Sequence, residues 1–386
     1  CLVGSEMCIR DRIMIDQIKK LGPGLLFAGA AIGVSHLVQS TKAGAEFGFG
    51  LIWALILCNF FKYPFFLFGT KYAFSTGETL LHGYKKIGDY VLYTYLLLSI
   101  VTIFTIQAAV TIVTAGLAVE LFGFNNNIAI MASIILILCI IILTVGKYKL
   151  LDNFIKIVIL ILALSTLFAV GYATNNNVVE LNFNQIFPDE VSGIIFLAAF
   201  MGWMPAPLDI SIWQSIWTKE KLNLNNKIKY KSALFDFNVG YISTVFLGLC
   251  FVALGAFVMF GSGQTFSNNG SEFANQLIKL YTANLGENVK IFISVAAFTT
   301  MLSTTITCLD ASPRAMSQTL KLLNHKKISG YNTWILIISI VTMIIFVFFE
   351  SEMGALIKIA TILSFITAPI YAIMNYSLVN LSLIHI

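Results

Sequence analysis

The sequence predicts an all-α, polytopic membrane protein made of two five-helix repeats of opposite topology. Of its 386 residues, 58% are hydrophobic and only 11% are charged, whereas soluble domains carry about 25% charged residues. Ten apolar segments and two interruptions within them support the same fold. The lysines lie in short loops rather than on one face, so the net charge of +5 does not indicate nucleic-acid binding. The six cysteines form no CxxC pair or Cys/His cluster, which excludes a disulfide framework or a metal cluster of that kind.

The ten apolar segments are each long enough to cross a bilayer, for which a helix needs about 20 residues. Turns rich in asparagine and glycine separate several of them. We expect membrane-spanning helices at about residues 21–46 (broken), 51–74, 91–120, 127–145, 150–172, 191–217 (broken), 233–260, 288–316, 332–349 and 353–379.

The charges between these segments predict the orientation, because cytoplasmic loops are enriched in lysine and arginine. Alternate loops carry nearly all of the lysines and arginines if the N-terminus is cytoplasmic. The spans then form repeats at about 19–172 and 190–379 with opposite topology, which is typical of alternating-access transporters. We expect a multi-pass protein of the bacterial inner membrane or plasma membrane, with the lipid bilayer and a transported solute as its partners.

Both ends of the sequence look foreign to the protein. Residues 1–12, CLVGSEMCIRDR, and 381–386, LSLIHI, resemble translated sequencing-adapter DNA. We exclude them from the fold. We therefore expect a single transmembrane domain over residues 13–379, a native start at Met14 and a native C-terminus that this sequence lacks.

Two of the apolar segments are interrupted near their middle. The first, residues 21–48, places Ser35 and His36 at mid-span, and the second, residues 200–218, contains two prolines beside Asp209. Backbone that leaves the helix inside a bilayer must find other hydrogen-bond partners. Transporters bind their cargo at such breaks, so we expect the two interruptions to face each other across a solute site.

The chemical groups at the two breaks favour a transition-metal cation as cargo. A broken helix frees carbonyl groups, which bind cations, and each proline removes a backbone donor. Imidazole, thioether, carboxylate and carbonyl groups together suit such a metal better than a sugar or lipid. The predicted site comprises Ile32, Gly33, Ser35, His36, Met201, Met204, Pro205, Ala206 and Asp209, with His36, Met204 and Asp209 as metal ligands.

These residues also have structural interpretations. The prolines can simply kink the span, Met204 can fill the core, and His36 can join two helices by a hydrogen bond. Asp209 can cap the second half of its helix, although a carboxylate within a span is usually functional. Gly29 and Gly33 can form a helix-packing face.

Other polar residues of the spans have two interpretations as well. Asp310 and Arg314 are four residues apart and should pair on one helix face, as a structural pair or as a gate. The side chains that either line a path or join helices are Gln107, Thr111, Thr114, Thr361, Ser364 and Thr367. Lys42, Glu46, Lys62 and Asp236 lie toward span ends, where we expect their charged groups to reach the membrane surface.

Several motifs resemble those of the Nramp family of divalent metal transporters. They are Leu21-Gly22-Pro23-Gly24, Ala43-Gly44-Ala45-Glu46-Phe47-Gly48, Met204-Pro205, the run 146–152 and the run 303–307. The resemblance covers about residues 19–379. It implies the five-plus-five inverted-repeat (LeuT-like) fold of the amino acid–polyamine–organocation superfamily, with helices 1 and 6 broken, and import of manganese or ferrous iron with protons.

The metal site that the resemblance implies is only partly present. The family's Asp-Pro-Gly-Asn run in helix 1 falls on residues 33–36, so that Gly33 stands in the place of the metal-binding Asp and His36 in that of the Asn. In helix 6 the Met-Pro pair is present, but the family's His is Ala206 and its carbonyl ligand falls on Met201. A carboxylate ligand is therefore lost from helix 1, and Asp209 is the residue expected to replace it.

The sequence thus predicts a membrane transporter rather than an enzyme, which moves a divalent metal by alternating access and needs no other cofactor. Proton coupling is open, because the family's acidic helix-3 positions fall near Gln107 and Val110, whereas His36 titrates near neutral pH. One alternative is a transporter of an amino acid or another small organic solute, and another is a transport-inactive sensor or scaffold. A hydrolase built on Ser35 and His36 is not expected, since adjacent helical residues point apart.

Overall fold

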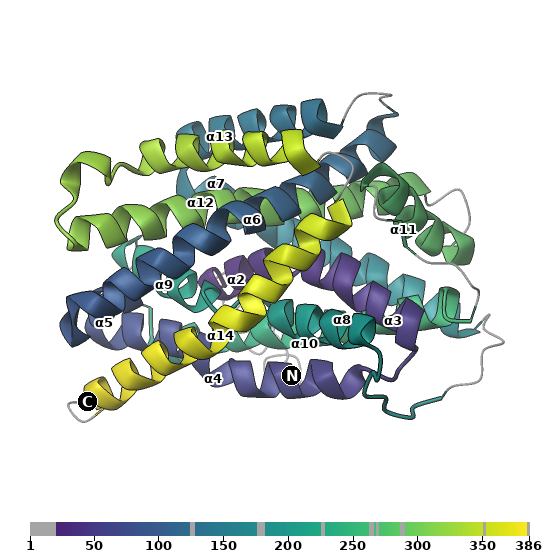
Figure 1. Ribbon diagram of the computed structural model, residues 1–386, viewed down its shortest axis with the longest axis horizontal. Coiled ribbons are helices and arrows are strands. Elements are labelled where there is room, and N and C mark those ends of the chain that lie inside the picture. The colour runs from purple at the N-terminus through teal and green to yellow at the C-terminus, as the bar shows by residue number, and fades with distance from the viewer. Residues whose placement is uncertain are drawn as a thin grey trace, which may run out of the picture.

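The computed structural model describes residues 21–123, 128–175, 182–224, 228–261, 266–267, 270–285, 290–349 and 353–383. Within these residues all regular secondary structure is helical (Figure 1). Each of the ten predicted segments is helical over its described part, apart from the two breaks. Of the two ends predicted to be foreign, residues 1–12 and 384–386 lie outside the described residues. Residues 381–383, which were also excluded from the predicted domain, continue α14 as helix.

The helices of the first predicted repeat follow the expected order. The first span is divided into α2 (Pro23–Ala31), the π-helical η1 (Ser35–Ser40) and α3 (Thr41–Phe47). It is followed by α4 (Ile52–Thr76), the short α5 (Leu80–Ile87), α6 (Asp89–Phe122) and α7 (Ile128–Asn175). The predicted fourth and fifth spans are parts of α7, whose segments Ile128–Val145 and Ile157–Thr174 are each long and apolar enough to cross a membrane. Helical backbone therefore continues where the sequence suggested two separate helices.

The second predicted repeat also begins with a divided span. Its two halves are α8 (Val191–Trp203) and α9 (Ile210–Leu224). They are followed by α10 (Tyr230–Val258), α11 (Gly270–Leu285), α12 (Lys290–Leu322), the 3-10 turn η3 (Lys326–Ile328), α13 (Tyr331–Phe349) and α14 (Met353–Leu383). The helices α5 and α11 are absent from the predicted set, because both are short and neither is apolar enough to be recognised as a span. The amphipathic α11 packs against α6, α7 and α12.

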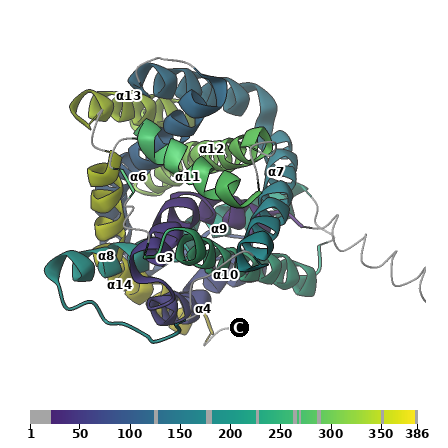
Figure 2. The same ribbon diagram turned by 90° about the vertical axis from the view of Figure 1, so that its right-hand side faces the viewer.

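Hydrophobic side chains cover the outside of the bundle. Figure 2, a view along the long axis, shows α3 and α9 near the middle and α7, α13 and α14 at the periphery. The peripheral helices expose large apolar residues, including Ile134, Ile141, Leu336, Ile340 and Ile373. Among the described residues, six helices are long and apolar enough to cross a membrane, or seven if the bent pair Pro23–Ala31 and Ser35–Phe47 is one span. The chain is an integral membrane protein, because only lipid solvates such a surface.

Both halves of the first span pack on α10 through backbone contact. A Cβ atom added to Gly240 would lie 2.0 Å from the carbonyl oxygen of Gly24, and one added to Gly255 would lie 2.1 Å from that of Thr41. Only glycine leaves space for helices this close. The broken first span is therefore held in the centre of the protein along its whole length.

Candidate functional site

The first break lies between α2 and η1, and the span bends there by 47° between Pro23–Ala31 and Ser35–Phe47. The carbonyl of Ala31 loses its helical partner there and gains two donors, with a ring nitrogen of His36 beside them. The hydroxyl of Ser35 donates to it, the backbone N–H of Gly33 lies at 3.0 Å, and Nδ1 of His36 also lies at 3.0 Å. The freed carbonyl is thus satisfied by groups of the same span.

The side chains of Ser35 and His36 contact each other, although they were predicted to point apart. The hydroxyl oxygen of Ser35 lies 2.7 Å from Nδ1 of His36. The backbone opens into a π-helix at Ser35, and both side chains turn back toward the carbonyl of Ala31. The expectation assumed regular α-helical spacing, which this segment does not have.

His36 faces α10. Its Nε2 lies 2.8 Å from the carbonyl oxygen of Thr244, and the residue is fully buried. Both ring nitrogens therefore have hydrogen-bond partners within the protein. This placement matches the structural interpretation of His36, a residue that joins two helices.

A side chain from α12 fills the space beside Gly33. The hydroxyl of Thr304 donates to the carbonyls of Gly29, at 2.9 Å, and Ile32, at 3.2 Å. A Cβ atom on Gly33 would lie 2.5 Å from the Thr304 hydroxyl oxygen. The position that the resemblance gives to a metal-binding aspartate therefore has no room for one, and the Ile32 carbonyl already has a donor.

The second break extends from Met204 to Asp209, between α8 and α9. The two prolines end the helix rather than kink it, because six residues separate the two halves. Asp209 directly precedes the first residue of α9, which is the N-cap position that one interpretation predicted. One of its carboxylate oxygens is buried and has no hydrogen-bond partner.

Lys62 supplies the donors at this break, which corrects the expectation that it reaches the membrane surface. Its ammonium nitrogen lies 2.8 Å from the carbonyl oxygens of Met201 and Gly202 and 3.1 Å from that of Ala206. The side chain is buried in the middle of α4. The Met201 carbonyl, predicted to bind a cation from solution, is therefore engaged by a cationic side chain.

The two breaks are joined by a weak polar contact. The hydroxyl of Ser40 in η1 lies 3.8 Å from the sulfur of Met204. Met204 otherwise packs in a small apolar cluster with Leu55, Leu197 and Phe200. The structure thus places the two breaks next to each other, as the sequence predicted.

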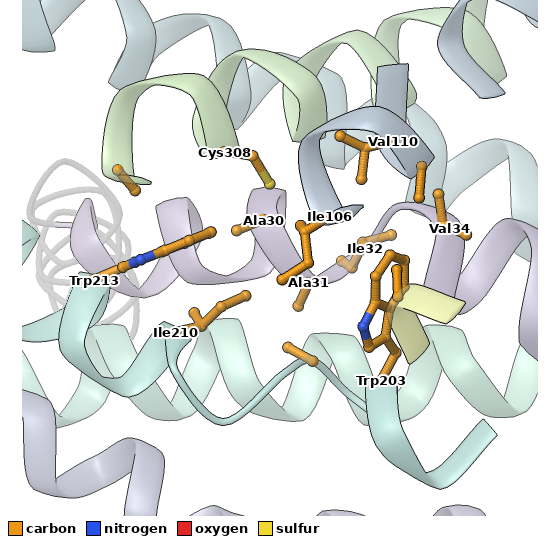
Figure 3. Close-up of a cluster of buried hydrophobic side chains, with 14 of the residues drawn as sticks. Ala30, Ala31, Ile32, Val34, Ile106, Val110, Trp203, Ile210, Trp213 and Cys308 are labelled. Carbon is orange, nitrogen blue, oxygen red and sulfur yellow. The ribbon is translucent and has the colours of Figure 1, made fainter. Parts of the chain in front are cut away.

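A small cavity of about 20 Å³ lies between the breaks. Figure 3 shows Trp203 and Trp213 on either side of Ala30, Ala31 and Ile210. Its volume suits a water molecule or a bare ion. Its wall is mainly apolar and consists of Ala30, Ala31, Val34, Ser35, Ile106, Val110, Trp203, Pro207, Ile210, Trp213, Thr304 and Cys308.

None of the three predicted metal ligands is part of this wall. His36 faces α10, Met204 lies in its apolar cluster, and Asp209 interacts electrostatically with Lys62. Within the described part of the chain, no group of three or more histidine, cysteine, aspartate and glutamate residues could hold a metal ion. Of the predicted site, only Ser35 lines the cavity.

The predicted path residues of α6 join that helix to α12. The amide of Gln107 donates to the Thr111 hydroxyl at 3.1 Å and to the Thr305 carbonyl at 3.4 Å. The Thr114 and Thr305 hydroxyls lie 2.7 Å apart. Thr361 bonds to carbonyls of its own helix, the nearer being that of Ile357 at 2.7 Å. The contacts of Gln107 and Thr114 fit the interpretation that these residues hold helices together, whereas the hydrogen bonds of Thr361 stay within α14.

Asp310 and Arg314 form the predicted pair. Arg314 Nε donates to Asp310 at 2.8 Å, and the hydroxyl of Tyr331 donates to the same carboxylate at 2.7 Å. The Arg314 guanidinium lies 5.0 Å from the centre of the Tyr331 ring. The buried carboxylate is thus satisfied by two neighbours.

Larger cavities open at opposite ends of the bundle. One of about 460 Å³ is lined by Gln39, Lys42, Glu46 and Lys358, among others. The other, of about 350 Å³, is lined by His82, Lys219, Arg314 and Tyr331, among others. Burial, and then the nearby Lys219 charge, lowers the pKa of His82, which lies on α5 outside the spans. The small central cavity therefore lies between two end cavities.

Three important residues were not recognised in the sequence analysis. Lys62 and Asp236 were expected at the membrane surface, and Thr304 was noted only as part of a motif. The Asp236 carboxylate instead accepts the backbone N–H groups of Gly22 at 2.8 Å and Gly24 at 3.0 Å, and so caps the start of α2. Burying an unpaired charge is costly, so the position of Lys62 and Asp236 within apolar segments is the signal that could have indicated specific partners for both.

The family model described as natural resistance-associated macrophage protein-like matches residues 24–384. The chain belongs to the Nramp family. An uncharacterised protein of Pasteurella multocida is 37% identical over 371 residues, which cover 94% of this chain and 86% of that protein.

Solved structures show the fold of this Nramp-family chain. A manganese transporter of Eremococcus coleocola, in complex with an aromatic bis-isothiourea compound, is similar with a TM-score of 0.70, 12% identity and coverage of 94% of this chain and 79% of that one. The nucleobase-cation-symport-1 family transporter Mhp1, with bound bromovinylhydantoin, gives a TM-score of 0.66, 14% identity and coverage of 92% and 77%. These likenesses confirm the five-plus-five, LeuT-like fold.

Proposed function

We propose that this chain is a secondary active transporter that carries a small, largely apolar organic solute by alternating access between the two broken spans. The composition of the central cavity carries this proposal. Its wall joins two tryptophans and several aliphatic side chains to the hydroxyl groups of Ser35 and Thr304. Sites for organic ligands combine an apolar wall with few polar groups in this way.

The hydrogen bonds at the two breaks argue against a metal as the first choice. A divalent cation needs several oxygen, nitrogen or sulfur ligands. The carbonyls of Ala31, Ile32 and Met201 already have donors, and Lys62 would repel a cation at the second break. The cavity also lacks a carboxylate.

The cavities at the two ends support transport over a scaffold role. They lie on opposite sides of the central cavity and are much larger than it. At about 20 Å³ the central cavity is too small for an organic solute in this state. The arrangement fits a contracted state, whose wall must open toward one end and widen before a solute enters. One end cavity is lined by the basic residues Lys219, Arg314 and Lys321. Because cytoplasmic ends are enriched in lysine and arginine, this favours a cytoplasmic position for that end and for the N-terminus.

Uptake into proteoliposomes tests the cargo directly. Radiolabelled manganese is compared with labelled amino acids, nucleobases and hydantoins, because Mhp1 holds a hydantoin in its structure. We expect uptake of at least one organic solute and manganese at the level of empty liposomes. Ala31→Leu, which fills the cavity, should abolish that uptake, whereas Ala372→Leu on α14 should not. Manganese uptake without uptake of any organic solute would contradict the proposal.

A divalent metal is the second candidate, and the free carboxylate oxygen of Asp209 favours it. The Eremococcus coleocola protein of the same fold is a manganese transporter. Calorimetry with manganese, magnesium, zinc and iron tests this candidate on the purified protein. Binding that is lost in both His36→Ala and Asp209→Ala would support metal transport, and binding that neither variant changes would exclude those ligands.

A further inference from the structure

Lys62 occupies a set of carbonyl groups that has the chemistry of a cation site. Met201 and Gly202 lie in the last turn of α8, where backbone carbonyls have no helical partner and carry partial negative charge. Ala206 lies in the break itself. Their three oxygens lie 2.8, 2.8 and 3.1 Å from the Lys62 nitrogen. An ammonium group has three donors, and each finds an acceptor here.

The Lys62 nitrogen interacts electrostatically with the Asp209 carboxylate without forming a direct ion pair. Among the described residues, no carboxylate lies within 4.0 Å of the Lys62 nitrogen, although Asp209 attracts it from farther away. Lys62 is only 8% exposed. A buried ammonium is costly unless its donors and its charge are both compensated, and the carbonyls and Asp209 do so together.

Free cations bind the same groups in other transporters of broken-helix design. Unwound carbonyls and the C-terminal ends of half-helices coordinate them at the membrane midplane. Carbonyl oxygens can replace the whole hydration shell of a monovalent ion. The groups around the Lys62 nitrogen are of this kind, yet their ligand is a side chain of α4.

We propose that Lys62 is a built-in cation, whose ammonium group occupies a monovalent-cation site formed by the carbonyls of Met201, Gly202 and Ala206 near Asp209. The broken sixth span therefore needs no inorganic ion at this place. Removing the side chain should leave a vacant site that a small external cation fills. The proposal does not depend on the identity of the cargo.

Melting temperatures of the purified full chain test this proposal in sodium chloride, methylammonium chloride and choline chloride at equal ionic strength. Choline is too large for the site. We expect the unmodified protein to melt at the same temperature in all three salts. We expect Lys62→Ala to melt lower in choline, and to gain roughly 3 to 6 °C, with saturation, in sodium or methylammonium.

Two further variants separate a filled site from a general salt effect. Lys62→Ala combined with Asp209→Asn should lose the gain, because the compensating charge is gone. Lys42→Ala should show no cation dependence, since Lys42 is a half-exposed residue paired with Glu46 at 3.5 Å. Equal melting of Lys62→Ala in all three salts would overturn the proposal.

The melting temperature of the unmodified protein can also refute the proposal, even if Lys62→Ala does not fold in choline chloride. A saturable rise of its own melting temperature in sodium, relative to choline, would mean that a free ion stabilises the protein and would overturn the proposal. Folded Lys62→Ala obtained only with sodium or methylammonium present would support it. Failure to fold in every salt would also count against it, because the vacant site should then have accepted a cation.

Discussion

In both broken spans, carbonyl groups that have left the helix need hydrogen-bond donors, but the donors differ between the two breaks. At the first break, neutral groups satisfy the freed carbonyls: the Gly33 N–H, the Ser35 hydroxyl and, from α12, the Thr304 hydroxyl. At the second break, the charged Lys62 of α4 does so. The first break is satisfied mainly by its own residues, and the second depends on another helix.

The local sequences explain this difference. The first break contains no proline and is followed at once by a serine and a histidine. The second, Met204-Pro205-Ala206-Pro207-Leu208, loses two N–H donors to proline and has no polar side chain before Asp209. Carbonyl acceptors therefore outnumber donors, and a side chain with three donors must come from elsewhere.

Lys62→Met should have the largest effect on stability. It removes the donors that α4 supplies to the second break and leaves the first break unchanged. It leaves the carbonyls of Gly202 and Ala206 without a donor, whereas that of Met201 keeps the Cys58 thiol at 3.1 Å. It also removes the positive charge that interacts with Asp209, so we expect a loss of about 4 kcal/mol. Unfolding in detergent measures it. Lys42→Met, at a half-exposed pair, should cost less than about 1 kcal/mol. Equal effects of the two substitutions would show that the second break does not depend on charge.

Gly240→Ala should rank second, and it tests the support of the first broken span by α10. The added Cβ would lie 2.0 Å from the carbonyl oxygen of Gly24, which is backbone and cannot rotate away. We expect a loss of about 3 kcal/mol in the same unfolding measurement. Gly248→Ala is the control on the same helix, because its nearest contact is a Leu55 methyl group at 3.3 Å. A Gly240→Ala variant as stable as this control would contradict the packing described here.

Thr304→Val tests how much the hydroxyl donor from α12 stabilises the first break. It keeps the shape of the side chain but removes the hydroxyl shared by the carbonyls of Gly29 and Ile32. Buried carbonyls without donors should cost about 1.5 kcal/mol. Thr300→Val is the matched control one turn earlier, since that hydroxyl bonds only to the carbonyl of Ala296 in its own helix. No difference between the two would mean that Thr304 does not stabilise the break.

Ser40→Ala should have the smallest effect, because it removes a weak contact between the two breaks and one long hydrogen bond within η1. The Ser40 hydroxyl lies 3.8 Å from the Met204 sulfur and 3.2 Å from the Ser35 carbonyl oxygen. We expect a loss of about 0.5 kcal/mol in thermal unfolding. A loss as large as that of Thr304→Val would indicate that the breaks are coupled more strongly than these distances suggest.

Much of the fold follows from the sequence. Hydropathy predicted each spanning helix, and prolines, small residues and isolated polar groups located both breaks. The Asp310–Arg314 pair followed from helical spacing alone. The short α5 and amphipathic α11 were missed, because their sequences resemble those of loops between spans.

The functional site was less predictable. His36, Met204 and Asp209 are predicted metal ligands because all three lie at breaks, but proximity to a break does not fix the direction of a side chain. His36 faces α10 and Asp209 lies outside the wall of the central cavity. That wall is formed mainly by alanines, isoleucines and tryptophans, which sequence patterns assign to the core. Such residues carry no local signal of a binding role.

The sequence by itself determined where the helices lie and where two of them come apart, because hydropathy and proline act over a few neighbouring residues. Only the tertiary structure decided what satisfies the breaks. Lys62 and Met201 are 139 residues apart, and Thr304 and Gly29 are 275 residues apart. Freed carbonyls inside a membrane must take their donors from whichever helix packs beside them, and that neighbour is set by the fold.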